Sequence, residues 1–488
     1  MLETLKPNKV FEYFEKICSI PHGSGNVKQI SDYLLSFGQE RGLYCRQDDA
    51  LNVVIVKEAT PGMEDKAPII IQGHMDMVAV KDEDIQKDLT KEGLDLDIDG
   101  DYIYAKGTSL GGDDGIAVAY ALALLDSDQI PHPRLEAVFT VDEEVGMDGA
   151  IAIDLSDLKG KKLVNIDSEK EGERTVACAG GGCVKGVFKP AYHEVEGLCY
   201  ELSLSGLTGG HSGVEIHKGL ANANKVLFQV LYLMAREADM TLISYEGGTK
   251  DNVIPSAAVC TFASRAEFEM LDGLVQIMEE SLKDEWKETD SNLSLKLVAL
   301  DTDTSKAKKG SPINLLGMDG NDFFDLLEFF NGVPNGVQKM NPSLEGLVQT
   351  SLNLGVVILE EGGKCQATFS VRSSVSAEKE ELSKLLTDRI QEFGGKSEVY
   401  GGYPAWEYRE DSELRDDMVR IYRGMFGKEP TVLSIHAGLE CGVLSEKIEG
   451  LDCVSFGPDI LQIHSTKERL SIASVQRMWD YLLEVIKA

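Results

Sequence analysis

Short apolar runs alternate with helical patterns through the first third of the chain, and this alternation limits the fold more than any other feature. The runs are NVVIVKE, APIIIQG, AVFTV and KKLVNID, at residues 52–58, 67–73, 137–141 and 161–167, and the helical pattern AVAYALALL occupies residues 117–125. Short apolar runs separated by helices are typical of strands that are buried on both faces of a sheet. We therefore expect an α/β domain with a mostly parallel central sheet and helices on both faces.

The pattern changes after Gly180-Gly181-Gly182. Longer segments with alternating polarity follow, such as YELSLSG, AVCTFASRAEF, LSLKLVAL and QATFSVRSS, with helical segments between them. This pattern indicates an antiparallel α+β domain. From about Gly394 the alternation of helix and strand returns. We expect one α/β domain, residues 1–186 and 393–488, interrupted by an inserted α+β domain at residues 187–392.

Composition narrows the classes of partner. The formal net charge of -34 repels nucleic acid phosphates and anionic lipid, and we expect neither a nucleic acid nor a membrane as a partner. The start of the chain, MLETLKPNKVFEYFEKIC, lacks the basic flank and apolar stretch of a secretory signal, and no apolar run is long enough to span a membrane, so we expect a cytoplasmic protein. The 9 cysteines form no CxxC pair and are interpreted as buried thiols.

Acids and histidines gather directly after the apolar runs. Three carboxylates in a row follow residues 137–141, and three like charges at a strand exit are costly unless a cation lies beside them. Ligand sites of open α/β sheets gather beyond the carboxyl ends of the strands. The candidate residues at such exits are His74, Asp76, Asp113, Asp142, Glu143, Glu144, Asp167 and His464.

Charge arithmetic favours two divalent ions. Their four positive charges would be balanced by a hydroxide and by Asp113, Glu144 and Asp167, with His74 and His464 as neutral ligands. Asp113 is the candidate for the carboxylate shared by both ions, and Asp76 is placed to fix the tautomer of His74. Glu143 is then left free as a general base.

Each of these residues also has an ordinary structural interpretation. A lone His-x-Asp is as often a buried core histidine, paired glutamates are usually solvated, and the acids of GGDDG, Asp113 and Asp114, could cap a helix. The joint occurrence after short apolar strands favours a two-metal hydrolase.

The segments GHMDMV, GTSLGGDDGIA, TVDEEVGMDGA, NIDSE and IHSTKERL resemble the metal-ligand series of the co-catalytic di-zinc peptidases related to aminoacylase, peptidase T and peptidase V. With GLTGGHSGVEIHKG, KDNVIPS, SVRSS and SIHAGLECG, the whole chain is similar to the aminoacyl-histidine dipeptidase (Xaa-His dipeptidase, peptidase D) branch. The resemblance implies a zinc-peptidase-like fold, and two ions held by the ligands named above. Zinc is expected, although manganese or cobalt would also suit these ligands.

The resemblance also implies that the insert is a lid that carries substrate-binding residues. His211 would reach the oxyanion or the substrate carboxylate, and Asn252 and Arg372 match positions that bind substrate in relatives. Glu440 could accept a free α-amino group, and His436 could line the pocket. His211 could equally be a turn histidine. In several relatives the lid histidine comes from a partner subunit, so a homodimer through the lid is implied, but a duplicated lid could supply it in cis.

Three functions are compatible with these residues. The sequence favours a metal-dependent dipeptidase that acts on unblocked dipeptides, including those with a C-terminal histidine, because Glu440 and Arg372 would hold two charged ends close together. The alternatives on the same site are a deacylase or a tripeptide aminopeptidase. A non-catalytic binding protein is disfavoured, since it would have no use for Glu143.

Overall fold

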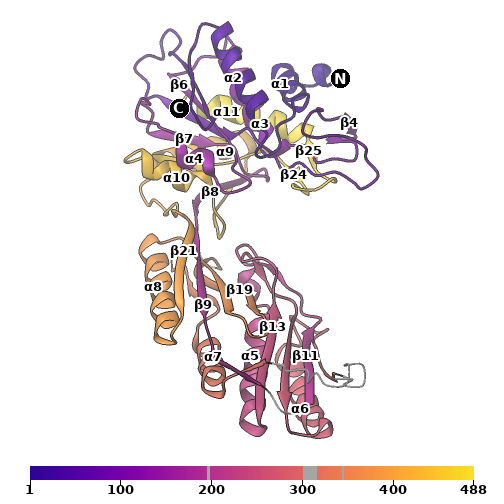
Figure 1. The fold of residues 1–488 in the computed structure, drawn as a ribbon. Helices are drawn as coiled ribbons and strands as arrows, with labels where there is room; N and C mark the ends of the chain where they lie inside the picture. The colour runs from indigo at the N-terminus through magenta and orange to yellow at the C-terminus, as the bar shows by residue number, and fades with distance from the viewer. Residues whose placement is uncertain (195–197, 301–315, 343–345) are drawn as a thin grey trace. The chain divides into compact units, whose positions relative to one another are not determined.

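The computed structural model of the chain describes residues 1–194, 198–300, 316–342 and 346–488, and it divides into two compact units (Figure 1). Unit 1 comprises Met1–Cys178, Trp406–Ser434 and Leu439–Ala488, and unit 2 comprises Ala179–Ala405 and Ile435–Gly438. The ends of unit 2 differ from the expected insert at 187–392, because β9 (Gly180–Phe188) and β21 (Lys396–Tyr403) pair with each other in the sheet of unit 2.

Unit 1 is built on an eight-stranded sheet whose central strands run parallel. β3 pairs in parallel with β6 and β7, and β7 pairs in parallel with β23, while the pairs β1–β2, β2–β6 and β23–β8 are antiparallel. The strand order is β1 (Tyr44–Gln47), β2 (Val53–Lys57), β6 (Leu135–Thr140), β3 (Ile69–His74), β7 (Lys162–Asn165), β23 (Asp452–Ser455), β8 (Glu173–Cys178) and β22 (Thr431–Ile435).

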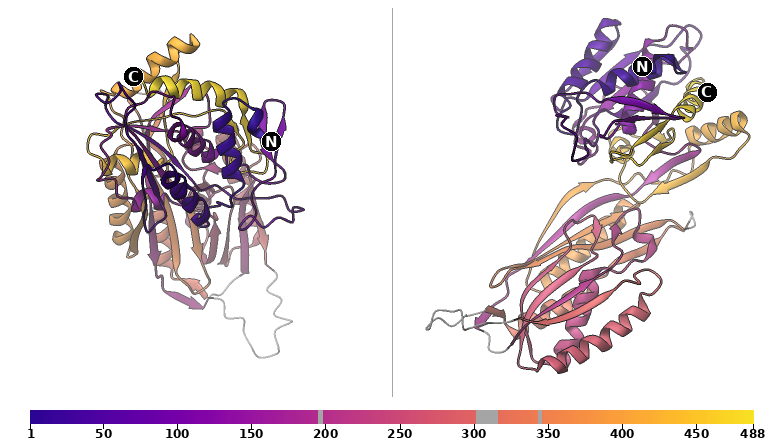
Figure 2. Two further views of the ribbon diagram at one scale, coloured as in Figure 1. Left: turned by 90° about the horizontal axis from the view of Figure 1, so that it is seen from above. Right: turned by 90° about the vertical axis from the view of Figure 1, so that its right-hand side faces the viewer.

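Helices cover both faces of this sheet (Figure 2). The helices are α1 (Asn8–Cys18), α2 (Lys28–Glu40), α3 (Gly112–Asp126), α4 (Asp148–Ala152), α9 (Glu413–Phe426), α10 (Glu440–Lys447) and α11 (Ile472–Val485). On one face, Ile69 and Ile71 of β3 share a core with α1, α2, α3, α9 and α11. On the other face α10 contacts β23, where Cys441 Sγ lies 3.0 Å from Cys453 Sγ. Burial from both sides explains the apolar runs of the central strands β3, β6 and β7.

A smaller sheet in unit 1 carries one of the predicted ligands in its loop. Its strand order is β24 (Ile460–Leu461), β25 (Arg469–Ser471), β5 (Tyr102–Ala105) and β4 (Leu96–Asp99). The loop between β24 and β25 contains His464.

Unit 2 has an antiparallel sheet, and its helices share one core with a single face of that sheet (Figure 2). Among the described residues, nine strands take part: β16 (Ser294–Ala299), β11 (Leu198–Ser205), β15 (Ala258–Ser264), β13 (Met240–Gly247), β19 (Val348–Leu359), β20 (Cys365–Ser373), β9 and β21 in that order, with β18 (Gly336–Met340) paired to β19. The helices are α5 (Ala223–Glu237), α6 (Phe268–Glu285), α7 (Gly320–Gly332) and α8 (Ser376–Glu392). Two short pairs are β10 (Tyr192–Glu194) with β17 (Leu316–Met318), and β12 (Gly210–His211) with β14 (Val253–Ile254). The predicted combination of a mostly parallel α/β sheet with an inserted antiparallel α+β domain is confirmed.

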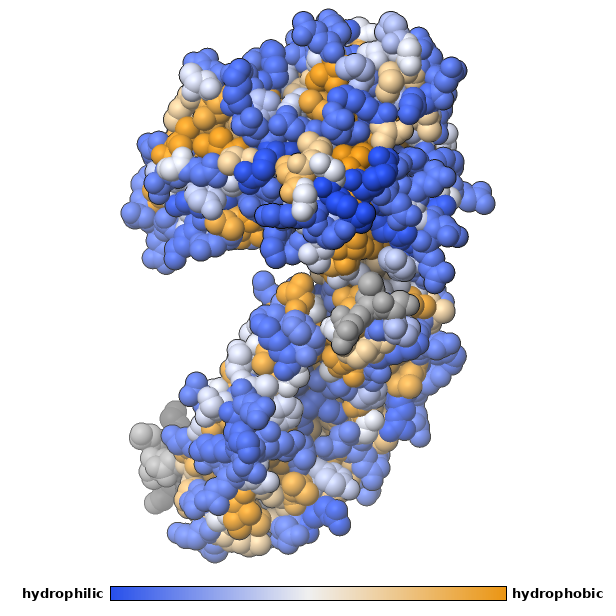
Figure 3. Space-filling model, turned by 180° about the vertical axis from the view of Figure 1, so that it is seen from behind, coloured by the Kyte–Doolittle hydropathy of each residue, from blue (hydrophilic) through white to orange (hydrophobic). Residues whose placement is uncertain are grey.

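Hydrophilic residues cover most of the surface on the side shown in Figure 3, and hydrophobic residues appear there in scattered patches. This surface accords with the high content of charged residues, 27%. Within the described ranges, no helix combines the length and the apolar character needed to cross a membrane.

Candidate active site

The predicted metal ligands meet at one edge of the unit 1 sheet. His74 is the last residue of β3, Glu144 lies in the turn after β6, and Asp167 follows β7. These three strands are neighbours and parallel, so their carboxyl ends lie at the same edge. Asp113 lies in the first turn of α3, and His464 comes from the loop between β24 and β25.

Asp113 lies between the two histidines and presents one oxygen to each. Asp113 Oδ1 is 3.1 Å from His74 Nε2, and Asp113 Oδ2 is 3.1 Å from His464 Nε2. Asp167 Oδ1 is 3.7 Å from His74 Nε2, and Glu144 Oε1 is 2.9 Å from His464 Nε2. Each histidine therefore has the Asp113 carboxylate and one further carboxylate within 3.7 Å.

The chemistry of these donors fits divalent cations. Imidazole nitrogens and carboxylate oxygens are ligands of zinc, manganese and cobalt. Atoms of His74, Asp113 and Glu144 lie within 4.8 Å of one another, as do atoms of His74, Asp114 and Asp167. Asp167 Oδ2 is buried and finds no hydrogen-bond partner among the described residues, which is costly unless a cation binds it.

The surplus of carboxylates shifts several pKa values in this cluster. Contacts with Asp113 and Glu144 raise the pKa of His464 to about 10. Burial acts to lower the pKa of His74, but the neighbouring Asp113, Asp167 and Asp76 outweigh it and hold the pKa well above its usual value. Burial raises the pKa of Asp167 to about 7. The cluster thus concentrates negative charge where a cation would be stabilised.

Asp76 supports both a ligand and the acidic turn. Its Oδ1 lies 3.4 Å from His74 Nδ1, and its backbone oxygen lies 3.0 Å from the same nitrogen. The carboxylate also accepts hydrogen bonds from the backbone N–H of Glu143 at 3.1 Å and from Ser24 Oγ at 2.8 Å. Burial would raise the pKa of Asp76, but these contacts outweigh it and lower the pKa. Asp76 is therefore placed to orient His74 and the turn that holds Glu144.

The three consecutive acids Asp142, Glu143 and Glu144 have different surroundings in the structure. Asp142 Oδ1 accepts a hydrogen bond from Gly25 N at 2.6 Å, so this residue ties the turn to the loop after α1. Glu144 faces His464. Glu143 stands between Asp142 and Glu144 in the sequence. Burial raises the pKa of its carboxyl group well above the usual value, despite the opposing effect of His74. The charges of Asp167, Glu440 and Glu144 act in the same direction as burial. The charges of the cluster therefore shift the pKa of the Glu143 carboxyl group.

Asp114 is a residue of the cluster that sequence reasoning missed. Its side chain is buried, and its Oδ2 accepts a hydrogen bond from the backbone N–H of His74 at 3.2 Å. The sequence allows this acid to be a helix cap, although the doubled acid in GGDDG is a signal that points to the cluster. The structure instead places it in a candidate ligand set with His74 and Asp167.

Glu440, at the start of α10, is completely buried in unit 1. Its Oε2 accepts hydrogen bonds from Gln72 Nε2 at 2.6 Å and from Thr140 Oγ1 at 2.7 Å. Burial raises its pKa to about 7. Its Oε1 is without a hydrogen-bond partner in the part of the chain that the structure describes, and this is the atom that the predicted contact with a substrate amine would use.

The other predicted substrate-binding residues lie in unit 2, where three of them cluster. His211 Nδ1 accepts hydrogen bonds from the backbone N–H of Gly213 at 3.0 Å and of Val214 at 3.2 Å, which leaves Nε2 to carry the proton. A Cβ atom at Gly213 would lie 2.6 Å from the backbone oxygen of His436, so the two histidine segments are in close contact. Burial, followed by the charge of Arg372, lowers the pKa of His211.

Arg372 and His436 are linked through strand β19. Ser351 of β19 is the register partner of Arg372, and its Oγ lies 2.7 Å from His436 Nε2. Arg372 Nη1 donates to Tyr403 Oη at 2.7 Å, whereas Arg372 Nε and His436 Nδ1 are buried with no partner within the described ranges. Burial, and to a lesser extent the positive charge of Arg372, lowers the pKa of His436 to about 3.

Asn252 joins this group through the backbone. Its carbonyl oxygen accepts a hydrogen bond from the N–H of Ser212, the residue after His211, at 2.9 Å. The predicted residues therefore form two groups, with the ligands, Asp76, Glu143 and Glu440 in unit 1 and His211, Asn252, Arg372 and His436 in unit 2.

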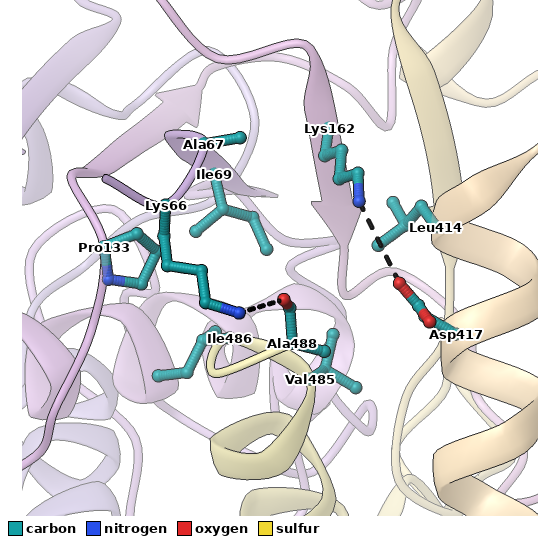
Figure 4. A pocket seen from close by; sticks show the side chains of 10 residues that line it. All are labelled: Lys66, Ala67, Ile69, Pro133, Lys162, Leu414, Asp417, Val485, Ile486 and Ala488. Atoms are coloured by element: carbon teal, nitrogen blue, oxygen red, sulfur yellow. Dashed lines mark hydrogen bonds and ion pairs between the residues drawn. The ribbon is translucent and has the colours of Figure 1, made fainter. Parts of the chain in front are cut away.

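A small cavity in unit 1 lies away from this edge of the sheet. It is lined by Ile69 and Lys162, the first residues of β3 and β7, and Lys66 Nζ beside it donates to the backbone oxygen of Ala488 at 2.9 Å (Figure 4). Its volume of about 40 Å³ is too small for a dipeptide. Since it opens at the amino ends of the strands, it does not belong to the ligand cluster.

Known proteins resemble the chain over its full length. The cytosol non-specific dipeptidase of Escherichia coli (strain K12) is 38% identical over 493 aligned positions, which cover 100% of this chain and 98% of that protein. The crystal structure of aminoacylhistidine dipeptidase from Vibrio alginolyticus has 37% sequence identity and a TM-score of 0.90, covering 100% of this chain and 98% of that one. The aminopeptidase PepT from Bacillus cereus is 16% identical with a TM-score of 0.55, covers 99% of this chain and 98% of that one, and shares the fold.

The family assignment agrees with the resemblance found in the motifs. Residues 70–488 match peptidase family M20/M25/M40, and this span includes His74, Asp113, Glu144, Asp167 and His464. Together with the full-length identity of 38%, this match shows that the chain belongs to peptidase family M20/M25/M40 and is a metallopeptidase.

Proposed function

We propose that this enzyme is a cytoplasmic dipeptidase that hydrolyses unblocked dipeptides, including those with a C-terminal histidine, at a site for two divalent ions. The observation that carries the proposal is the position of Asp113, with one carboxylate oxygen 3.1 Å from each of the two histidines. A carboxylate placed in this way can serve two ions at once. The relatives named as a cytosol non-specific dipeptidase and as an aminoacylhistidine dipeptidase support the substrate class and the compartment.

The proposal divides the ligands between two ions. His74 and Asp167 would hold one ion, Glu144 and His464 the other, and Asp113 both. Zinc is the proposed metal, and manganese or cobalt would also suit these donors. When bound, the ions would polarise the peptide carbonyl and lower the pKa of the attacking water.

Glu143 is the proposed general base. It follows β6 directly beside the ligand Glu144, and its backbone is held by Asp76. Its carboxylate would accept the proton of the attacking water and deliver it to the leaving amine. Asp76 would act through His74, by holding the imidazole in one orientation.

The predicted substrate-binding residues would recognise the two charged ends of the substrate. Arg372 Nε is an unused buried donor, and a guanidinium can hold a carboxylate in two hydrogen bonds, so Arg372 would bind the C-terminal carboxylate. His211 would donate from Nε2 to the oxyanion or to the same carboxylate, with His436 and Asn252 beside it. Glu440 would accept the free α-amino group at Oε1.

A homodimer formed through unit 2 is part of the proposal, and sedimentation equilibrium would test it.

Release of free histidine tests the proposal. Zinc- or manganese-loaded protein is incubated with alanyl-histidine, β-alanyl-histidine and N-acetyl-alanyl-histidine. We expect cleavage of free dipeptides and none of the acetylated one, because a blocked amine cannot pair with Glu440. Cleavage of the acetylated substrate alone would identify a deacylase. No release from any of the three would refute hydrolysis of dipeptides that end in histidine, and an alanyl-alanine assay would then show whether other dipeptides are cleaved.

A further inference from the structure

A buried carboxylate from one ligand-bearing loop holds the backbone of the other. Glu468 lies four positions after His464 in the sequence, and its side chain is buried. Its Oε2 accepts hydrogen bonds from the N–H groups of Leu110 at 2.8 Å and Gly111 at 3.1 Å. Its Oε1 accepts from Gly112 at 2.8 Å and, more weakly, from Asp113 at 3.5 Å. Four consecutive amides of the segment that carries Asp113 therefore converge on one side chain.

Two of these amides, those of Gly112 and Asp113, begin α3, whose backbone departs from helical geometry at Asp113 and Asp114. The first N–H groups of a helix have no intrahelical partners. An aspartate in the first turn would ordinarily be attracted to such groups. Glu468 occupies them, and the Asp113 carboxylate instead faces His74 and His464. Gly112 leaves room for this arrangement, since a Cβ atom there would lie 3.2 Å from Glu468 Oε1.

The loop that carries Glu468 has a strained backbone around the ligand. Gln462 has a φ of 53° and His464 a φ of 59°, both in the left-handed region that residues other than glycine rarely adopt. Such a conformation persists only where the surroundings fix it. The contacts of Glu468 fix one end of this loop against α3.

We propose that Glu468 is a positioning residue that sets the distance between His464 and Asp113 and so preorganises the shared metal site. This inference rests on the proposed two-metal site. Glu468 acts on the ions through the two ligands, because its oxygens are occupied by backbone amides. Partners that orient metal ligands typically contribute a factor of about 10 to 100 in metal affinity.

The test compares two helix-capping carboxylates of unit 1. Glu468→Gln keeps the size of the side chain but removes its charge and turns an N–H donor toward the amides. Asp452→Asn is the matched control, because Asp452 is also buried and accepts hydrogen bonds at the start of α9, from Leu414 N at 2.9 Å and Ser412 Oγ at 2.6 Å. Asp452 lies at the first residue of β23, where the parallel strands begin, and α9 carries none of the predicted ligands.

Metal binding and the visible spectrum of cobalt provide the readouts. Competition with a chelating indicator gives the stoichiometry and affinity for Co²⁺, and thermal unfolding gives stability. We expect both variants to lower Tm, but only Glu468→Gln to weaken binding at least about tenfold and to change the cobalt spectrum. Glu468→Asp, which keeps the charge on a shorter side chain, should fall between wild type and Glu468→Gln.

Three results would overturn the inference. One is normal cobalt affinity and an unchanged spectrum in Glu468→Gln, which would make Glu468 a structural cap. Another is an equal loss of affinity in Asp452→Asn. The third, which needs no variant, is rapid hydrogen exchange of amides 110–113 in the metal-loaded wild type. The hydrogen bonds from these amides to Glu468 would then be absent in solution. If wild-type protein itself failed to bind two ions, the proposed site would fail instead.

Discussion

The neighbouring glutamates of the acidic turn have different proposed roles. Glu144 Oε1 lies 2.9 Å from His464 Nε2, and Asp76 Oδ1 holds the backbone N–H of Glu143. Of the two carboxylates, that of Glu144 is the proposed ligand and that of Glu143 the proposed base. A single charge-neutralising substitution at each residue should therefore separate proton transfer from metal binding.

We expect Glu143→Gln to lower kcat by about 10²- to 10⁴-fold, the usual contribution of a general base, while the metal content stays at the wild-type value. Glu144→Gln should instead lower the metal content, because an amide is a weaker ligand than a carboxylate. Steady-state kinetics with metal analysis of the same samples measures both effects. Near-normal turnover of metal-loaded Glu143→Gln would rule out the assigned base.

Some site residues could be predicted from sequence because each follows an apolar strand. His74, Glu144 and Asp167 have that signal, and the parallel sheet brings their strand ends together. Glu468 has no such signal, because its partners are backbone amides 355 to 358 positions away. Backbone amides are present at nearly every residue, so no pattern of side chains could reveal this contact.

His436 provides a prediction about stability and pH. Its pKa in the folded protein is about 3, below the ordinary value of 6.5, because of burial and then Arg372. Between these values the unfolded chain binds a proton that the folded chain does not, so unit 2 loses stability as pH falls below 6.5, by about 1.4 kcal/mol per pH unit. His436→Gln removes this titration.

Hydrogen exchange of the sheet of unit 2 at pH 7 and pH 5 gives the free energy of unfolding of this unit and so checks the predicted loss of stability. Wild-type protein should lose about 2 kcal/mol more than His436→Gln over that interval. Equal losses in the wild type and in His436→Gln would contradict the assigned environment of His436.

At the scale of elements, the site depends on close packing of β3 against α3. A Cβ atom at Gly73 of β3 would lie 2.5 Å from both the Cβ of Ala117 and the Oδ2 of Asp114, which belong to α3. The side chain of any other residue would force the strand and the helix apart. His74 and Asp113 are carried by these two elements, so the same displacement would separate two ligands.

Gly73→Ala should therefore destabilise unit 1 by about 1–3 kcal/mol, the usual cost of overpacking, and also weaken metal binding. Gly424→Ala in α9 is the control. Apart from its chain neighbours and the backbone of α9, no described atom lies within 4 Å of a Cβ there, and alanine favours helix. Thermal unfolding with metal titration measures both properties. A stable Gly73→Ala with full metal affinity would show that the spacing of β3 and α3 is not critical.

Strands β2, β3, β6 and β7 of unit 1 could be predicted from their apolar runs, but the order of the strands in the sheet could not. β23 inserts between β7 and β8, although it lies nearly 300 residues after β7 in the chain. Periodicity shows that a strand is buried and does not identify its neighbours. The ends of unit 2 differ from the expected insert because periodicity does not identify strand neighbours there either. β9 pairs with β20 and β21 of the unit 2 sheet, and these pairings place β9 and β21 in unit 2.

At the scale of the whole molecule, the two units carry different groups of residues. The candidate metal ligands belong to unit 1, and Arg372, His211 and His436 belong to unit 2. Substitutions in unit 2 should therefore change the response to the substrate while the metal content stays constant. The C-terminal carboxylate of the substrate provides a direct means of separating the two effects.

Arg372→Met should lower kcat/KM for alanyl-histidine by about ten- to one hundred-fold, the value of one or two charged hydrogen bonds. It should have little effect on alanyl-histidine amide, which lacks the carboxylate and should be a poor substrate for the wild type. Arg389→Met is the control. The half-buried Arg389 of α8 pairs with Glu392 at 2.7 Å, so its replacement removes the same charge from unit 2 and should change neither rate. Equal losses on acid and amide would mean that Arg372 supports the fold of unit 2, because only a contact with the carboxylate can distinguish the two substrates.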